Sequence, residues 1–152
     1  MRVIFLDIDG VLNDNYQSEP FILPHCAKAF NRIVGETEAK VVIASSWRNW
    51  VHGGLMTLLG FQRMLRTHCI TCHVIGVTPA DGNVHGRGRQ ITAWLADSAP
   101  VVSYVVLDDD EYDIREHGHP LVRTDARTGL SEQDADLAIE LLTADDPPSV
   151  RV

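Results

Sequence analysis

The sequence is poor in cysteine and in positive charge, and it contains no long apolar run. The 152 residues include only three cysteines, an uneven number, which does not suggest a disulfide framework. Thirteen lysines and arginines stand against 21 acidic residues, and the net charge of −8 argues against a general nucleic-acid or membrane surface. No apolar run approaches the roughly 20 residues of a membrane span, and the first residues do not resemble a signal peptide. We therefore expect a cytoplasmic protein with free thiols.

The composition is ordinary for a soluble globular protein, with 45% hydrophobic and 22% charged residues. A chain of this length buries a sizeable core, and the sequence shows no repeat or low-complexity segment. We predict a single domain over residues 1–143. Residues 144–152, which include the run Asp145-Asp146-Pro147-Pro148-Ser149, are predicted to form a flexible C-terminal tail.

The most informative stretch is residues 3–13, an apolar run interrupted by Asp7, Asp9 and Gly10. An apolar run of this kind without alternation is typical of a buried parallel strand. Carboxylates are costly to desolvate, so two of them at the end of such a strand require a cation, a proton or a reaction. A turn-capping role for Asp7 and Asp9 is the weaker interpretation. Gly10 permits a sharp turn and the close approach of a ligand to the backbone.

Strands and helices alternate along the rest of the chain. Further strands are predicted at residues 39–46, 69–77, 101–107 and 121–124, and helices at 25–34, 54–66, 89–97 and 131–142, with Gly35 as a helix stop and Ser131 with Asp134 as a helix cap. This alternation predicts an α/β fold, a three-layer, doubly wound parallel sheet of about five strands with right-handed crossovers.

Polar residues end three of the predicted strands. These residues are Asp7 and Asp9 at the first strand, Ser45 and Ser46 at the second, and Asp108 and Asp109 at the fourth. Parallel strands place their carboxyl ends at one edge of the sheet, where ligands of open α/β sheets bind. We therefore expect the three pairs to converge.

With these motifs the sequence resembles the haloacid dehalogenase (HAD) superfamily of phosphohydrolases. Four motifs follow the family's order: Asp-x-Asp-Gly at residues 7–10, a strand ending in Ser at 41–45, a Lys or Arg before a helix, and a strand ending in an acidic pair at 105–109. The resemblance spans about residues 1–143. The Ser-Ser-Trp-Arg stretch at 45–48, the Arg-Gly-x-x-Ile-x-x-Trp-Leu stretch at 87–95 and Thr-Gly-Leu at 128–130 also resemble the small phosphatase domains of some nucleic-acid repair proteins.

The resemblance implies a Mg²⁺-dependent phosphomonoester hydrolase that works through an aspartyl-phosphate. Asp7 would be the nucleophile, and Asp9 would protonate the leaving oxygen and then activate the water that cleaves the intermediate. Ser45 would hydrogen-bond a phosphoryl oxygen. Arg87 is the preferred cation of the third motif, because the Arg-Gly-x-x-Ile spacing fits the repair-protein domains, and Arg89 is the second choice. The family commonly uses Lys at this point, so the assignment stays open.

The resemblance also implies a set of oxygen ligands, which suits Mg²⁺. The set comprises the Asp7 side chain, the Asp9 carbonyl and an acid of the fourth motif, for which Asp109 is preferred over Asp108. Asp113, four residues beyond Asp109, would orient a metal-bound water.

The loops supply the predicted substrate contacts. Ser46, Arg48 and Arg89 are the predicted substrate-binding residues, and Trp47 either stacks on the substrate or packs beneath its loop. No cap domain fits in the intervals between the motifs, so the loops at residues 13–24 and 78–86 would exclude water and select the substrate. An open site suits a large substrate, such as a nucleic-acid end or a phosphoprotein, or a site closed by an oligomer partner.

Nucleotide or polynucleotide ends are the favoured phosphorylated substrates, because of the resemblance to repair proteins. The acidic net charge favours a small phosphorylated metabolite instead. The motifs are also compatible with a phosphotransferase that uses the same intermediate and with a non-catalytic HAD-like binding module.

Residues 68–73 suggest a separate, weaker hypothesis. Cys69 and Cys72, flanked by His68 and His73, resemble half of a zinc site. No second pair of ligands is present at a matching spacing, and strand alternation would point these side chains apart.

Overall fold

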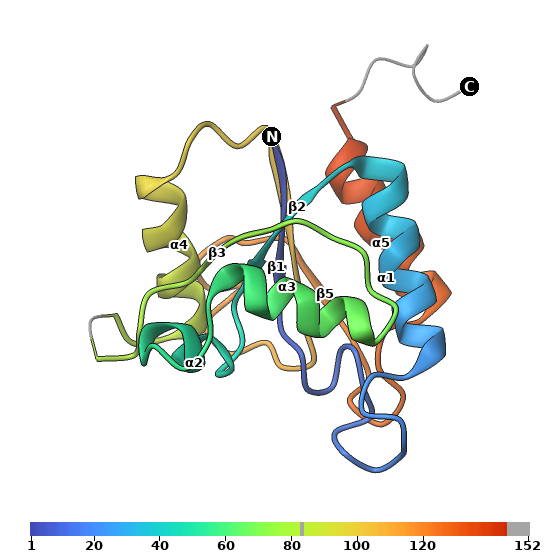
Figure 1. The fold of residues 1–152 in the computed structure, drawn as a ribbon. Coiled ribbons are helices and arrows are strands. Elements are labelled where there is room, and N and C mark those ends of the chain that lie inside the picture. The colour runs from blue at the N-terminus through green and yellow to red at the C-terminus, as the bar shows by residue number, and fades with distance from the viewer. Residues whose placement is uncertain (83, 146–152) are drawn as a thin grey trace.

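Five parallel strands form one sheet in the computed structural model, which describes residues 1–82 and 84–145. The strands are β1 (Arg2–Leu6), β2 (Lys40–Ile43), β3 (Val74–Val77), β4 (Ser103–Asp108) and β5 (Leu121–Arg123). Their order across the sheet is β3-β2-β1-β4-β5, and every neighbouring pair is parallel. β1 is therefore the central strand, with β2 and β4 on either side (Figure 1).

Helices cover both faces of this sheet. They are α1 (Pro24–Thr37), α2 (Arg48–His52), α3 (Leu58–Thr67), α4 (Arg87–Asp97) and α5 (Glu132–Thr143). α1, α3 and α5 pack on one face and α4 on the other (Figure 1). The three-layer parallel α/β fold predicted from the sequence is confirmed.

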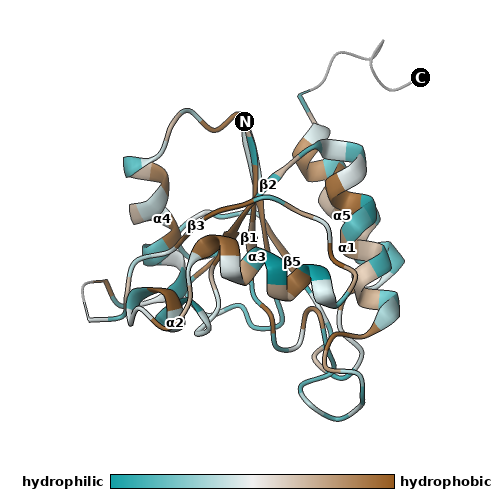
Figure 2. Ribbon diagram, in the orientation of Figure 1, coloured by the Kyte–Doolittle hydropathy of each residue, from teal (hydrophilic) through white to brown (hydrophobic). Residues whose placement is uncertain are grey.

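The strands are buried on both faces, which explains their continuous apolar sequences. Alternate residues of β1 enter different cores: Ile4 and Leu6 lie against α1, α3 and α5, whereas Val3 and Phe5 lie on the α4 side. Figure 2 shows the apolar strands in the interior and polar residues on the outer sides of the helices. In the part of the chain that the structure describes, no helix is long and apolar enough to cross a membrane.

The ends of two helices can be compared with their predicted signals. Gly35 does not end α1, which continues to Thr37, because Glu38 adopts the left-handed conformation (φ 56°) that closes the helix. The predicted cap of α5 is confirmed, since Ser131 Oγ accepts from the Asp134 N–H and the Asp134 carboxylate accepts from the Ser131 N–H. The predicted C-terminal tail begins in a turn at residues 144 and 145, and its remaining residues, 146–152, lie outside the described residues.

The α3 helix buries fewer apolar side chains than its sequence predicts. In the helix predicted at residues 54–66, the apolar residues at helical spacing predict a buried stripe of Leu55, Leu58, Leu59, Phe61, Met64 and Leu65. In the structure α3 begins only at Leu58, and Leu55 lies in the segment between α2 and α3 with 81% of its surface exposed. Phe61 and Leu65, four residues apart, are fully buried, whereas Leu59 is 54% exposed.

Two leucines of α3 provide a matched test of this packing. Leu65→Ala removes a fully buried side chain and is expected to lower the free energy of unfolding by about 3 kcal/mol. Leu59→Ala, in the same helix, is expected to lower it by less than about 1 kcal/mol, because the side chain is already half in water. Urea unfolding followed by circular dichroism measures both values. Equal losses would contradict this orientation of α3.

Candidate active site

Carboxylates from two adjacent strands meet at the carboxyl edge of the sheet. Asp7 follows β1, Asp108 is the last residue of β4, and Asp109 comes directly after it. One carboxylate oxygen from each of the three lies within 4.8 Å of the others. The Asp7 N–H donates to the Leu107 carbonyl at 3.0 Å, so the β1–β4 hydrogen bonding continues up to the acids. We call these three residues the acid cluster.

The acid cluster lies largely out of solvent. Asp108 is fully buried and Asp7 is 7% exposed. Burial raises the pKa of Asp7 to about 8, and the charge of Asp108 and a hydrogen bond with Asp109 also raise it, while Arg87 opposes the change. Burial also raises the pKa of Asp108 to about 6, again against the effect of Arg87.

The acid cluster has the chemistry of a divalent-cation site. Carboxylates in contact require a shared proton or a cation between them, because their charges repel. Three converging carboxylate oxygens from Asp7, Asp108 and Asp109 match the hard oxygen ligands that Mg²⁺ prefers. The residues present therefore fit such an ion.

Arg87, the first residue of α4, reaches the acid cluster. Its Nη1 lies 2.6 Å from Asp108 Oδ2 and 3.4 Å from Asp7 Oδ1, and its guanidinium carbon lies 4.9 Å from the centre of the Tyr112 ring. Arg89 is exposed and lines a surface groove with residues of the same helix and of the preceding loop. Of the two arginines considered for the third motif, the structure brings Arg87 to the acids.

Asp9 is held by two donors beside the turn that follows Asp7. Its carboxylate accepts from Asn13 Nδ2 at 3.1 Å and from Trp47 Nε1 at 3.0 Å. Asn13 Oδ1 in turn accepts from the Gly10 N–H at 2.9 Å. Gly10 has φ 82°, and a Cβ there would lie 2.6 Å from the Asp109 carboxylate, so a side chain at this position would collide with the acid cluster.

The two serines of the second motif occupy different places. The Ala44 N–H donates to the Leu6 carbonyl at 2.9 Å, so β2 and β1 run together into the loops that begin with Ser45 and Asp7. Ser45 is buried, and its Oγ accepts from a backbone N–H two residues ahead at 3.2 Å. Ser46 is exposed.

Arg48 lies inside the protein, which differs from the substrate contact predicted for it. Its side chain is only 3% exposed. The guanidinium donates to the carbonyls of Ser45 (2.9 Å) and Pro79 (3.1 Å) and forms an ion pair with Asp81. Because α2 starts at Arg48, the side chain turns inward and joins the end of β2 to the loop after β3.

Asp113 does not join the acid cluster. Its two carboxylate oxygens accept from the N–H groups of Gly88 (2.6 Å) and Arg89 (3.2 Å), and His117 Nε2 lies 3.4 Å away. The side chain thus satisfies free donors at the start of α4, where a negative charge also suits the helix dipole. The structure gives Asp113 this capping contact in place of a position beside a metal.

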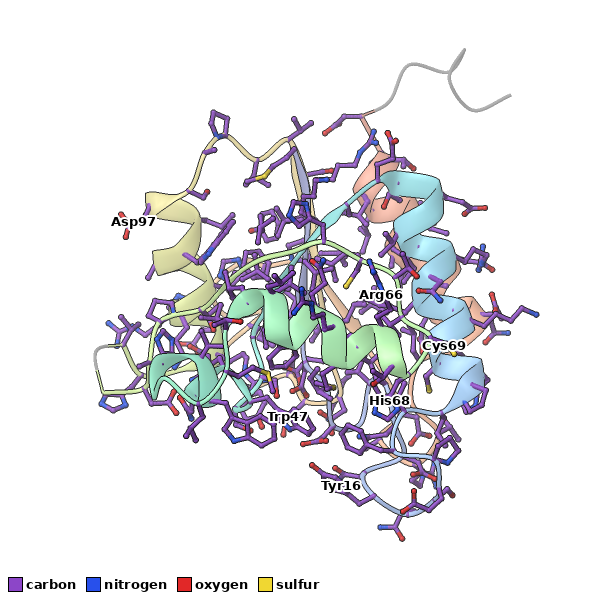
Figure 3. All side chains as sticks on the ribbon, viewed as in Figure 1. Tyr16, Trp47, Arg66, His68, Cys69 and Asp97 are labelled. Atoms are coloured by element: carbon purple, nitrogen blue, oxygen red, sulfur yellow. The ribbon has the colours of Figure 1, made fainter. Side chains whose placement is uncertain are left out.

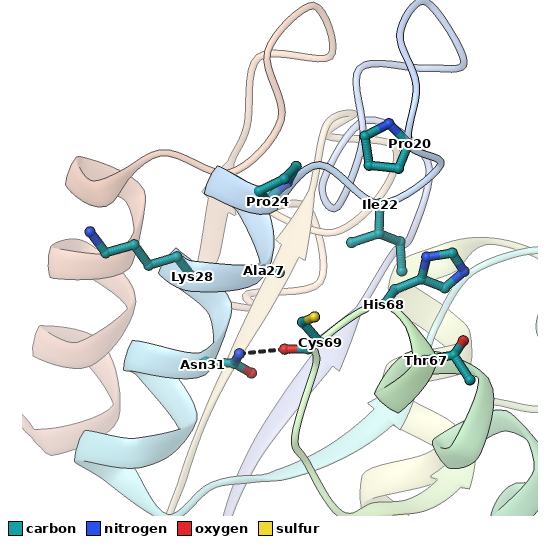
Figure 4. A pocket seen from close by; sticks show the side chains of 9 residues that line it. All are labelled: Pro20, Ile22, Pro24, Ala27, Lys28, Asn31, Thr67, His68 and Cys69. Carbon is teal, nitrogen blue, oxygen red and sulfur yellow. Dashed lines mark hydrogen bonds between the residues drawn. The ribbon is translucent and has the colours of Figure 1, made fainter.

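A cavity of about 480 Å³ lies between α1, the loop before it and the end of α3 (Figure 4). Residues such as Pro20, His68 and Cys69 line it, and the acid cluster does not. Cys69 is exposed and Cys72 is buried. Across residues 1–82 and 84–145 the acid cluster is the only group of three or more His, Cys, Asp or Glu side chains with the proximity of metal ligands, so residues 68–73 do not belong to a site with three such ligands.

Four residues around the acids were not singled out in the sequence: Asn13, Tyr16, Tyr112 and Thr124. Thr124 follows β5, and its Oγ1 donates to the Gly10 carbonyl at 2.7 Å. Asn13 and Tyr112 lie four and three residues beyond motif acids, which is the sequence signal they offer. Thr124 lies more than 100 residues from its partner, and no local pattern marks it.

The buried acids predict a pH-dependent stability for the metal-free protein. Folding raises the pKa of Asp7 and Asp108 above the ordinary value of about 4, so the folded chain binds more protons than the unfolded chain. The free energy of unfolding should therefore fall as the pH rises from about 4 to about 8. Asp7→Asn is expected to flatten this fall and to be more stable than wild type at pH 8 by at least about 1 kcal/mol.

Urea unfolding in EDTA at pH 5 and pH 8 measures this effect. Asp97→Asn is the control with the same charge change, because Asp97 is exposed at the end of α4, far from the lower edge of the molecule where Trp47 lies (Figure 3). It should keep the wild-type dependence on pH. A wild-type dependence in Asp7→Asn would contradict the burial of that charge.

A family model described as "HAD domain in Swiss Army Knife RNA repair proteins" matches residues 3–135. No curated protein and no solved structure matches the chain. The matched residues run from β1 into α5 and contain all five strands and the acid cluster. They support a HAD-type phosphohydrolase, which acts on a phosphorylated substrate, and they confirm the resemblance seen in the sequence. The chain therefore belongs to the family of HAD domains found in Swiss Army Knife RNA repair proteins.

Proposed function

We propose that the protein is a Mg²⁺-dependent phosphohydrolase that cleaves phosphomonoesters through an aspartyl-phosphate on Asp7. The observation that carries the proposal is the meeting of three carboxylates with Arg87 at the carboxyl edge of the sheet, with Arg87 Nη1 3.4 Å from Asp7 and 2.6 Å from Asp108. Nucleotide or polynucleotide ends are the proposed substrates, on the strength of the RNA-repair description of the family.

Asp7, Asp108 and Asp109 would hold the Mg²⁺ ion, together with the Asp9 carbonyl. When bound, the ion offsets the repulsion between the anionic phosphoryl oxygens and an attacking carboxylate. The burial of Asp7 and Asp108 is unfavourable for ionised carboxylates alone, which is why these acids suit a cation. Asp113 is left out of the proposed ligands, because Gly88 and Arg89 N–H groups engage its carboxylate.

Asp7 acts as the nucleophile. One of its carboxylate oxygens forms a bond to phosphorus while the bond to the ester oxygen breaks, which divides a difficult hydrolysis into two easier steps. Arg87 bridges the phosphoryl group and Asp7 and favours the ionised carboxylate. Ser45, at the start of the neighbouring loop, donates a hydrogen bond to a phosphoryl oxygen.

Asp9 acts as the acid and then as the base. It gives a proton to the leaving oxygen and later takes one from the water that cleaves the aspartyl-phosphate. Asn13 and Trp47 hold its carboxylate at 3.1 Å and 3.0 Å, so it keeps a fixed orientation two residues from the nucleophile. Such fixed placement is required for efficient proton transfer.

Phosphate release tests the proposal directly. The substrates are p-nitrophenyl phosphate and oligonucleotides phosphorylated at the 3′ or the 5′ end, each with Mg²⁺ or with EDTA. Wild type is expected to turn over only with Mg²⁺, and Asp7→Asn to lose activity about 10³-fold or more. Full turnover by Asp7→Asn would contradict the covalent mechanism. A folded wild-type protein that binds Mg²⁺ but hydrolyses none of the substrates would overturn the proposal in favour of the binding module.

Two arginines of α4 provide a matched pair for the phosphate-binding cation. Arg87→Met is expected to lower kcat/KM for p-nitrophenyl phosphate about 10²-fold, because it removes the charge beside Asp7 and Asp108. Arg89→Met removes the same charge two residues later, from an exposed position, and is expected to lower it less than about fivefold. A larger loss for Arg89→Met would reverse the assignment of the cation.

A further inference from the structure

Four aromatic rings form a continuous stack at the mouth of the site. Tyr16 stacks on Phe21 (5.6 Å between centroids, 27° between planes), and Phe21 stacks on Trp47 (5.0 Å, 16°). Trp47 lies against Trp50 at 4.7 Å and 40°. Tyr16 and Trp50, at the two ends, are 62% and 41% exposed, while the middle rings are half-buried. We call these four residues the aromatic stack.

The aromatic stack contacts Asp9 through the indole nitrogen of Trp47. Trp47 Nε1 donates to Asp9 Oδ2 at 3.0 Å. Burial, together with the nearby Asp9 carboxylate, raises the pKa of Tyr16. Both residues lie at the lower edge of the molecule in Figure 3. A carboxylate has about four acceptor positions, and Trp47 and Asn13 occupy two of them, so others are left for a ligand.

The loop that carries Tyr16 has an unusual backbone conformation. Asn15 and Tyr16 have successive positive φ values of 62° and 69°, which side chains rarely adopt. The Asn13 and Asp14 side chains accept hydrogen bonds from three N–H groups of the loop, at 3.0 to 3.1 Å. Strained residues that are held in this way cluster at ligand sites.

We propose that the exposed face of Tyr16 is the subsite for the base of the terminal nucleoside, next to the phosphate to be removed. The inference rests on the proposed function, in which Asp9 protonates the leaving oxygen. That oxygen carries the organic part of the substrate, which must therefore lie beside Asp9. Tyr16 is an exposed end of the aromatic stack, which contacts Asp9 through Trp47 Nε1, so the open face of Tyr16 offers an aromatic platform on that side of the site.

Base stacking also accounts for recognition by an acidic protein. Every base has a planar π face, so an aromatic side chain binds it without a row of basic residues. With a net charge of −8, the chain does not favour long contacts to a phosphate backbone. A subsite for a single base next to a single phosphate, at Tyr16 and Arg87, needs no such contacts.

Substrates that differ only in the terminal base test the subsite. Hexanucleotides phosphorylated at the 3′ or the 5′ end are prepared with either adenine or an abasic sugar at the phosphorylated residue, and kcat/KM is measured for each. Wild type is expected to prefer the adenine-bearing substrate about tenfold, as for one base stacked on an aromatic ring. Tyr16→Leu is expected to reduce this preference below twofold, and Tyr16→Phe to keep it, because the phenyl ring retains the stacking face.

Tyr112→Leu is the matched control. Tyr112 is a second exposed tyrosine, 58% exposed, and it lies against Arg87 instead of Asp9. This variant is expected to keep the tenfold preference for adenine whatever its absolute rate. Loss of the preference in Tyr112→Leu, or its persistence in Tyr16→Leu, would overturn the subsite.

Binding separates failure of the subsite from failure of the proposed function. Fluorescence anisotropy of the same labelled hexanucleotides gives the ratio of dissociation constants without any turnover. If no hexanucleotide is hydrolysed but the adenine-bearing one binds about tenfold more tightly, and Tyr16→Leu abolishes the difference, the subsite is supported and the hydrolase is not. Equal binding of both hexanucleotides by wild type, together with equal turnover, would overturn the subsite alone.

Discussion

The repulsion between three clustered carboxylates, two of them buried, is the constraint on which the rest of this structure depends. Asp7, Asp108 and Asp109 are placed within 4.8 Å of one another because two parallel strands end side by side. Ionised acids so close together and so poorly solvated require positive charge. Arg87 supplies part of it from the first turn of α4, at 2.6 Å from Asp108. Gly10 lets the chain pass these acids without a side chain. A divalent cation at the acid cluster would balance the remaining negative charge.

The loops around the acids are held by hydrogen bonds that cross the sheet edge. Arg48 joins the end of β2 to the loop after β3 through carbonyls and Asp81. Thr124, after β5, holds the Gly10 carbonyl, and Asn13 holds both the Gly10 N–H and Asp9. A site whose loops are fixed in this way has a defined shape without a covering domain. This suits a substrate whose reactive phosphate is at the end of a larger molecule.

In this interpretation, charged groups and aromatic residues recognise different parts of the substrate. The positive charge at the acid cluster would come from the half-buried Arg87 and the proposed metal ion, and it would bind one phosphate. The aromatic stack is uncharged, and it lies on the side of Asp9 where the leaving group would be. An acidic protein can therefore act on the end of a nucleic acid while binding little of its backbone. The same separation explains why the acidic composition favoured small phosphorylated metabolites as substrates, whereas the motifs favoured nucleotide or polynucleotide ends.

The sequence by itself determined the parallel α/β sheet and the strand ends that carry the acids, because strand and helix periodicities and turn residues are local signals. It preferred Arg87 to Arg89 but left the choice open, since both lie in the first turn of the same helix. The tertiary structure brought Arg87 to the acids, turned Arg48 inward and placed Asp113 at the start of α4. It brought Tyr16 to Asp9. These outcomes depend on contacts between segments that are distant along the chain, and packing of such segments has no counterpart in local sequence patterns.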